Sequence, residues 1–150
     1  MRLAPAFLTP AFLALSTIAA PAAAQDAPLD PRAAFYELRV YHPHPGKLDA
    51  LNARFREHTL KLFEKHGMRN VAYWIEQPSD TAPDGKVIYV LAYPSREARD
   101  ASWQAFVADP DWQAVQSASE ANGKLVAKVD STFMSLADYS PPVALTKGSD

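Results

Sequence analysis

The chain has 150 residues, of which 48% are apolar, and its formal net charge is −2. Seventeen of its 72 apolar residues fall within the first 24 positions, so the remaining 126 residues are about 44% apolar, a value normal for a soluble domain. This composition excludes predominant disorder and limits the chain to one domain, and the slightly acidic charge argues against nucleic acid as a partner.

The N-terminus has the pattern of a secretory signal peptide. Arg2 is its only charge, an apolar stretch follows, and the small residues Ala22 to Ala24 form a cleavage site before Gln25. Prolines and hydroxyl residues interrupt the stretch, so it is poorly suited to span a bilayer. The chain contains no cysteine for a lipid anchor or a disulfide. We therefore expect residues 1–24 to be cleaved and the mature protein to be periplasmic or secreted by a bacterium, without membrane contact.

The first half of the mature chain predicts one strand, one helix and a hairpin. Residues 34–41 alternate in the way a strand does, and residues 48–66 carry an apolar stripe with helical spacing that ends at Gly67. Residues 70–77 and 87–93 are rich in β-branched and aromatic side chains and are joined by a polar loop.

The second half predicts two helices and a last strand. Ser95 is a suitable N-cap for one helix, and Asp109 followed by Pro110 restarts a second helix that ends near Gly123. Residues 127–136 then form an extended segment. We expect a flexible leader over residues 25–33, a domain over 34–139 and a flexible tail over 140–150.

The order β-α-β-β-α-α-β predicts an α+β, ferredoxin-like fold, with a four-stranded antiparallel sheet covered by helices on one side. Both faces of the two hairpin strands are apolar, with Val71, Tyr73 and Ile75 expected on the face opposite Ala72 and Trp74. Helices can cover only one of these faces. We therefore predict a homodimer whose two sheets pack face to face.

Several motifs make the mature chain resemble the NIPSNAP family, within the dimeric α/β-barrel superfamily. They are the run Tyr36-Glu37-Leu38-Arg39-Val40-Tyr41, the segment Pro45 to Leu48, the helix end at His66-Gly67, and Phe106 to Trp112. The resemblance covers about residues 35–139 and implies a ferredoxin-like protomer in a dimeric α/β barrel. It also implies relatives of diverse chemistry, including cofactor-free quinone-forming monooxygenases and haem-degrading enzymes, and a NIPSNAP branch without a settled reaction.

Three polar residues share one face of the first predicted strand. Glu37, Arg39 and Tyr41 follow one another at every second position. Because an unpaired buried charge is costly, we expect them to form a polar network, either as a structural ion pair or with Arg39 as an anchor for an anion or a carbonyl group.

The histidines allow weaker hypotheses. His58 lies near the apolar stripe of the first helix and His66 lies at its end, so either is a candidate haem ligand, although packing and capping roles are commoner. His42 and His44 lack a third ligand at a suitable spacing. We predict no metal site and no resident cofactor.

The aromatic residues favour a pocket between helices and sheet. We expect it to be lined by ligand-binding residues, listed in chain order as Arg39, His58, Trp74, Tyr89, Trp103 and Phe106. The leading hypothesis is an exported homodimer that binds a small, largely apolar molecule or serves as an interaction module. The alternatives are a cofactor-independent monooxygenase acting on an aromatic or quinol substrate, with His58 or Tyr89 as the proton acceptor, and haem binding.

Overall fold

The computed structural model describes residues 28–80 and 83–145. The predicted signal peptide, the start of the predicted leader and the last five residues lie outside the described residues. The elements in chain order are β1 (Phe35–Pro43), α1 (Leu48–Arg54), a π-helical turn η2 (Phe55–Thr59), α2 (Leu60–Lys65), β2 (Arg69–Ile75), β3 (Val87–Tyr93), α3 (Arg96–Ala108), α4 (Pro110–Ser119) and β4 (Val126–Met134). In the part of the chain that the structure describes, no helix is long and apolar enough to cross a membrane.

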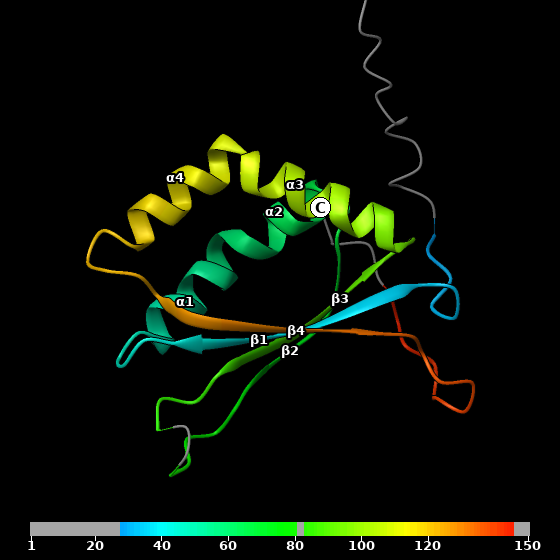
Figure 1. Ribbon diagram of the computed structural model, residues 1–150, viewed down its shortest axis with the longest axis horizontal. Coiled ribbons are helices and arrows are strands. Elements are labelled where there is room, and N and C mark those ends of the chain that lie inside the picture. The colour runs from blue at the N-terminus through cyan, green and yellow to red at the C-terminus, as the bar shows by residue number, and fades with distance from the viewer. Residues whose placement is uncertain (1–27, 81–82, 146–150) are drawn as a thin grey trace, which may run out of the picture.

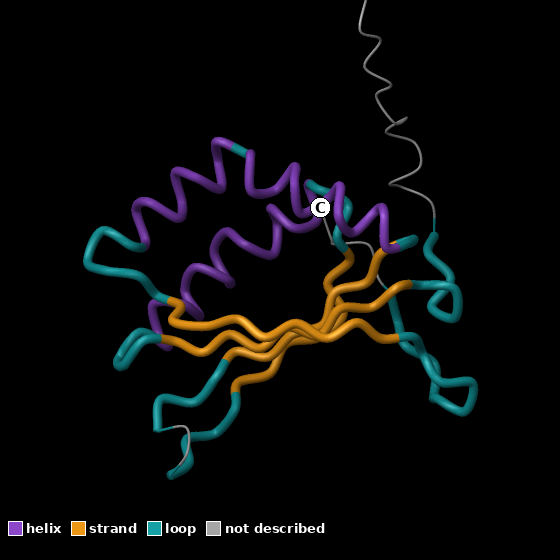
Figure 2. The backbone as a smooth tube through the Cα atoms, in the orientation of Figure 1, coloured by secondary structure: helices purple, strands orange, loops and turns teal. Residues whose placement is uncertain are grey.

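The four strands form one antiparallel sheet in the order β2-β3-β1-β4. All the helices lie on one side of it, which leaves the other face of the sheet without a helical cover (Figure 1 and Figure 2). The predicted α+β, ferredoxin-like architecture is thus confirmed. We call the two sides of the sheet the helix face and the open face.

The first helix is continuous from α1 to α2 but contains a π turn that the sequence pattern did not indicate. The backbone N–H of Leu60 donates to the carbonyl of Phe55, five residues back. Buried side chains recur every four residues at Leu51, Phe55, Thr59 and Phe63. Side chains spaced four residues apart drift around the axis of an α-helix, because the helix has only 3.6 residues per turn. One wider π turn corrects this drift and keeps these side chains facing the sheet.

The end of this helix follows the prediction. Gly67 has a φ of 76°, a left-handed value that glycine adopts without strain. Its N–H donates to the carbonyl of Glu64, and that of Met68 donates to Phe63, as in a Schellman cap. Met68 is thereby turned into the core, where it is fully buried.

A bulge in β2 changes the expected faces of that strand. Asn70 pairs with Leu91 and Ala72 pairs with Val90, so Val71 is an extra residue between them. Val71 packs with the open-face cluster instead of sharing the helix face with Tyr73, as strict alternation would require. The prediction for Val71 was therefore wrong, because period-two counting assumes that the strand has no bulge.

Helices α3 and α4 are capped as predicted. The Ser95 hydroxyl accepts a hydrogen bond from the N–H of Ala98 at 3.2 Å, and the Asp109 carboxylate accepts one from the N–H of Asp111 at 2.9 Å. Val107 of α3 is 57% exposed.

We expect Ser95→Ala to lower the free energy of unfolding by about 1 kcal/mol, since it removes the acceptor for an N–H of the first turn of α3. Ser95→Gly is the control, because glycine is a tolerated N-cap and is expected to cost only a few tenths of a kcal/mol. Urea denaturation of both variants measures the difference. Equal losses in the two variants would contradict a capping role.

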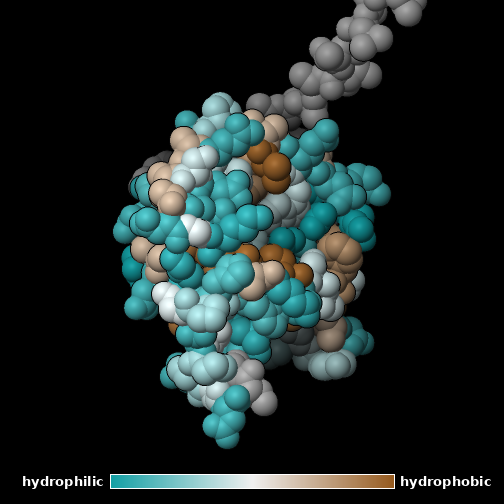
Figure 3. All heavy atoms as spheres, turned by 60° about the vertical axis from the view of Figure 1, so that its left-hand side comes forward, coloured by the Kyte–Doolittle hydropathy of each residue, from teal (hydrophilic) through white to brown (hydrophobic). Residues whose placement is uncertain are grey.

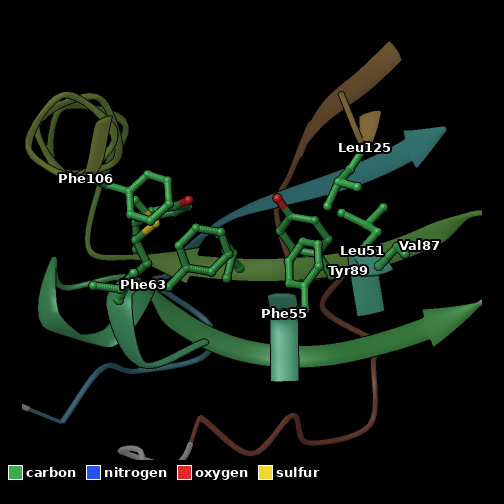
Figure 4. Close-up of a cluster of buried hydrophobic side chains, with 11 residues drawn as sticks. Leu51, Phe55, Phe63, Val87, Tyr89, Phe106 and Leu125 are labelled. Atoms are coloured by element: carbon green, nitrogen blue, oxygen red, sulfur yellow. The ribbon is translucent and has the colours of Figure 1, made fainter. Parts of the chain in front are cut away.

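The main core lies between the helices and the sheet (Figure 4). It combines Leu51, Phe55 and Phe63 of the first helix with β3 residues such as Tyr89. Ring contacts connect these layers, with the centroids of Phe55 and Tyr89 5.2 Å apart and those of Phe63 and Phe106 5.0 Å apart. The core therefore fixes the helices on the sheet through aromatic side chains.

The segments before β1 and after β4 meet each other. Arg32 donates hydrogen bonds to the carbonyls of Ala137, Asp138 and Ser140 at 3.0 to 3.2 Å. Leu29 and Leu145 pack against the small open-face cluster around Tyr36. The two segments thereby cover one end of the open face.

Candidate functional site

A network of polar side chains is centred on Glu37, which is fully buried on the helix face of β1. Arg39 and Arg99 both bond to its Oε1, at 2.7 and 2.6 Å, and the Arg99 Nε also donates to Oε2 at 2.8 Å. Ser131 of β4 donates to Oε1 at 2.6 Å. Two cations from different elements therefore converge on one carboxylate, which joins β1, β4 and α3.

These contacts determine the protonation of Glu37. Burial by itself raises the pKa of the Glu37 carboxyl, but hydrogen bonds from Arg99, Ser131 and Arg39 outweigh burial and lower it from 4.5 to about 2. Glu37 is therefore ionised at neutral pH.

Aromatic side chains complete this network. The Arg39 guanidinium lies 4.1 Å from the ring centroid of Trp103, and its Nε donates to the Tyr89 hydroxyl at 3.0 Å. The indole N–H of Trp103 lies 2.9 Å from the Tyr93 hydroxyl and 3.1 Å from Oε2 of Glu37. Arg39 thus contacts side chains of β1, β3 and α3, and its own side chain is only 13% exposed.

A cavity of about 310 Å³ lies beside this network, between the helix layer and the edge strand β4. Five aromatic residues line it, namely Tyr41, Phe55, Phe63, Phe106 and Trp112. The start of β4 supplies the opposite wall, from Val126 to Val129. This end of the molecule is mostly hydrophilic, with a small group of apolar side chains visible near its middle (Figure 3).

Arg54 is the buried cation of the cavity wall. Its side chain is 4% exposed, and its Nη1 donates to the Ser119 hydroxyl at 3.3 Å and to Oε1 of Glu120 at 3.1 Å. The guanidinium also lies 5.2 Å from the centroid of the Trp112 ring. The sequence pattern did not identify Arg54 as a site residue, although its position three residues after Leu51 places it beside the apolar stripe.

The structure brings some of the sequence-predicted site residues together. Arg39, Tyr89 and Trp103 meet in the polar network with Glu37, and the Tyr41 hydroxyl lies 3.5 Å from Nη2 of Arg39. Phe106 lines the cavity, and Trp103 contacts it edge to face with centroids 5.5 Å apart. Arg99 and Ser131 were not anticipated as members. The i, i+4, i+7 spacing of Arg99, Trp103 and Phe106 on α3 is the signal that could have identified Arg99.

Of the six predicted binding residues, only Phe106 lines the cavity, which corrects the expected pocket. Arg39, Tyr89 and Trp103 lie in the polar network beside it, and Trp74 and His58 lie at the surface. Trp74 is 52% exposed on the open face, because it alternates along β2 with Tyr73, whose ring packs on Tyr89. The His58 side chain is 48% exposed and faces Glu57, because Phe55 and Thr59 take the inward positions of the π turn. Neither residue lines the cavity.

The two candidate proton acceptors are poorly placed for that role. His58 is at the surface, as described above. Burial, followed by the neighbouring Tyr41, raises the pKa of the Tyr89 phenol well above its ordinary value of 10, although Arg39 opposes the shift. Tyr89 therefore stays protonated at neutral pH and donates or accepts hydrogen bonds as a neutral phenol.

His42 and His66 also have protein partners. Nε2 of His66 lies 2.6 Å from Oδ2 of Asp109, and Nε2 of His42 lies 2.7 Å from Oδ2 of Asp130. Within residues 28–80 and 83–145, no group of three histidine, aspartate or glutamate side chains is arranged to hold a metal ion.

Comparison with solved structures shows which proteins share this fold. An uncharacterized NIPSNAP-like domain protein from Burkholderia xenovorans is 18% identical, with a TM-score of 0.62 over 76% of this chain and 94% of that chain. A NIPSNAP domain protein from the same organism is 24% identical, with a TM-score of 0.59 over 72% of this chain and 99% of that chain. A NIPSNAP family protein of unknown function from Agrobacterium tumefaciens is 21% identical, with a TM-score of 0.60 over 75% of this chain and 96% of that chain.

Sequence comparison identifies the family. No curated protein matches the chain. The NIPSNAP family model, however, matches residues 36–141, which include the polar network, the cavity wall and every helix and strand except the first residue of β1. The chain therefore belongs to the NIPSNAP family.

Proposed function

We propose that the protein binds a small, largely apolar molecule in the cavity between the helices and β4. The observation that carries this proposal is the lining, in which five aromatic rings face a space of about 310 Å³. Pockets for small molecules commonly combine such apolar walls with a few polar groups. Tyr41, Thr59 and Arg54 supply polar groups here.

The composition of the lining favours binding over catalysis. Among the described residues that line the cavity there is no histidine or cysteine, and the one carboxylate, that of Glu120, is paired with Arg54. Histidine, cysteine and free carboxylates are among the commonest general bases and nucleophiles of enzymes. We therefore place binding ahead of an oxygenase-like reaction or haem ligation.

We expect Ala127→Phe to abolish binding of the neutral probe 1-naphthol, because a phenyl ring at this position of the β4 wall occupies the cavity. Titration followed by tryptophan fluorescence and by the melting temperature measures it, since a ligand that binds only the folded state raises stability. For the wild type, a ligand concentration of 100 times Kd should add about 2.7 kcal/mol.

Ala114→Phe is the matched control for this experiment, because Ala114 is an exposed residue of α4 outside the cavity lining. It should bind 1-naphthol as the wild type does. Absence of binding to the wild type would contradict the proposed function and favour an interaction module, whereas unchanged binding to Ala127→Phe would place the site elsewhere.

We further propose that the mature chain is exported and forms a homodimer through the open face. Leu38 and Val40 of β1 and Ile88 and Val90 of β3 lie on this face, beside the exposed ring of Trp74. No helix covers them (Figure 1). A second copy of the same face would bury these side chains, as expected for a two-fold symmetric interface.

We expect Leu38→Lys to convert the mature protein from twice the mass of one chain to the mass of a single chain, because it places a charge at the centre of the proposed interface. Light scattering at micromolar concentration measures the mass. Val107→Lys changes an exposed residue of the helix layer in the same way and should remain dimeric. A wild-type monomer would refute the proposed dimer.

A further inference from the structure

The cavity wall carries more positive than negative charge. Arg54 and Lys124 line it against the single carboxylate of Glu120, in a chain whose overall formal charge is −2. Lys128 also borders the cavity at the start of β4, but its ammonium pairs with Asp130 at 2.8 Å on the open face of the sheet. The sign of the charge at the cavity is therefore opposite to that of the whole chain, which favours an anionic ligand.

Arg54 has hydrogen-bonding capacity that the described residues leave unused. Its Nη1 is engaged by Ser119 and Glu120, but its Nε is buried and has no hydrogen-bond partner among the described residues. Buried donors are nearly always paired in folded proteins, so an unpaired one on a cavity wall calls for an acceptor. The Nε edge of a guanidinium, together with Nη2, fits the two oxygens of a carboxylate.

The backbone around Arg54 indicates the same location. Arg54 immediately precedes the π turn, and the Thr59 hydroxyl donates to the Arg54 carbonyl at 3.1 Å. Phe55 and Thr59, the first and last residues of that turn, both line the cavity. Single π turns within helices are frequent at functional sites, where the wider turn redirects side chains.

We propose that the cavity ligand is an organic carboxylate whose acid group binds Arg54 and whose apolar body packs against the aromatic wall. This inference rests on the proposed function, because it specifies the ligand class of the same cavity. Lys124 attracts the anion at the mouth of the cavity, and the Trp112 ring holds the guanidinium in place. Glu120 holds Nη1, so Nε and Nη2 are the donors left for the ligand, and the buried Nε must turn toward the cavity to reach it.

The test compares two probes of the same shape, 2-naphthoate and its neutral amide, 2-naphthamide, by calorimetric titration at low salt. The wild type should bind the acid about tenfold or more tightly than the amide, as expected for a charge-assisted hydrogen bond in a buried site. Arg54→Gln should remove this preference. Arg56→Gln, an exposed arginine outside the cavity lining, is the matched control and should retain it.

A second variant keeps the test valid if Arg54→Gln does not fold. Lys124→Gln changes an exposed side chain only, and should lower the preference for the acid about twofold and make it less sensitive to salt. Circular dichroism checks the fold of each variant.

The outcomes separate this inference from the proposed function. If the wild type binds the amide as tightly as the acid, the inference is wrong and the proposed function stands. If neither naphthalene probe nor 1-naphthol binds, the proposed function itself fails. A preference for the acid that survives Arg54→Gln, or that persists when Ala127→Phe blocks the cavity, would also overturn the role assigned to Arg54.

Discussion

Glu37→Gln should lower the free energy of unfolding by about 3–5 kcal/mol at neutral pH, the range seen when one member of a buried ion pair is removed. The variant keeps the shape of the side chain but leaves the guanidinium groups of Arg39 and Arg99 without their shared carboxylate, inside a network that is almost closed to solvent. Urea denaturation with an unchanged m value measures the loss.

The matched control for Glu37→Gln is Asp100→Asn. Asp100 is 55% exposed and contacts the same Arg99 at 3.0 Å. Because an exposed ion pair contributes little, its removal should cost at most about 1 kcal/mol. Similar losses in the two variants would show that burial of Glu37 is not what makes its ion pairs important.

Acid should remove the contribution of Glu37 within a defined pH range. Its pKa is about 2 in the folded protein and 4.5 ordinarily, so the unfolded chain binds the proton more readily. The stabilisation is therefore fully present above about pH 4.5 and is lost as the pH falls toward 2. We expect the stability difference between wild type and Glu37→Gln, about 3–5 kcal/mol at neutral pH, to shrink over this range.

Unfolding curves at closely spaced pH values between 6 and 2 measure this change. A difference between wild type and Glu37→Gln that stays constant down to pH 2 would contradict the assignment of Glu37 as a carboxylate of lowered pKa. Asp100→Asn again serves as control, since its difference from wild type should remain small throughout this range.

The sheet and the helix ends could be predicted from sequence because each depends on local chemistry. Alternation defined β1, and the capping residues Ser95 and Asp109 defined where α3 and α4 begin. The π turn and the bulge at Val71 could not be predicted in this way. Both insert one residue into a regular pattern, and both result from packing between elements that are distant in sequence.

The candidate site was only partly predictable for the same reason. The spacing of Glu37, Arg39 and Tyr41 placed three polar groups on one strand face, which the structure shows to be the helix face. Which residues on other elements meet them depends on how α3 crosses the sheet, so Arg99 was missed. Arg54 was missed because a charged residue on a helix is usually solvated, and only the packing of α4 shows that this one is buried.

The hydrogen bonds from Arg32 to the carbonyls of Ala137, Asp138 and Ser140 extend the structural unit beyond its helices and strands. The regular elements suggest a domain over residues 34–139, yet Arg32 lies before that range and Ser140 after it. Trimming the chain to its strands and helices would remove both sides of this contact, which holds the segment before β1 beside the segment after β4. A short peptide linker could therefore join these two segments, with new termini opened in the loop between β2 and β3.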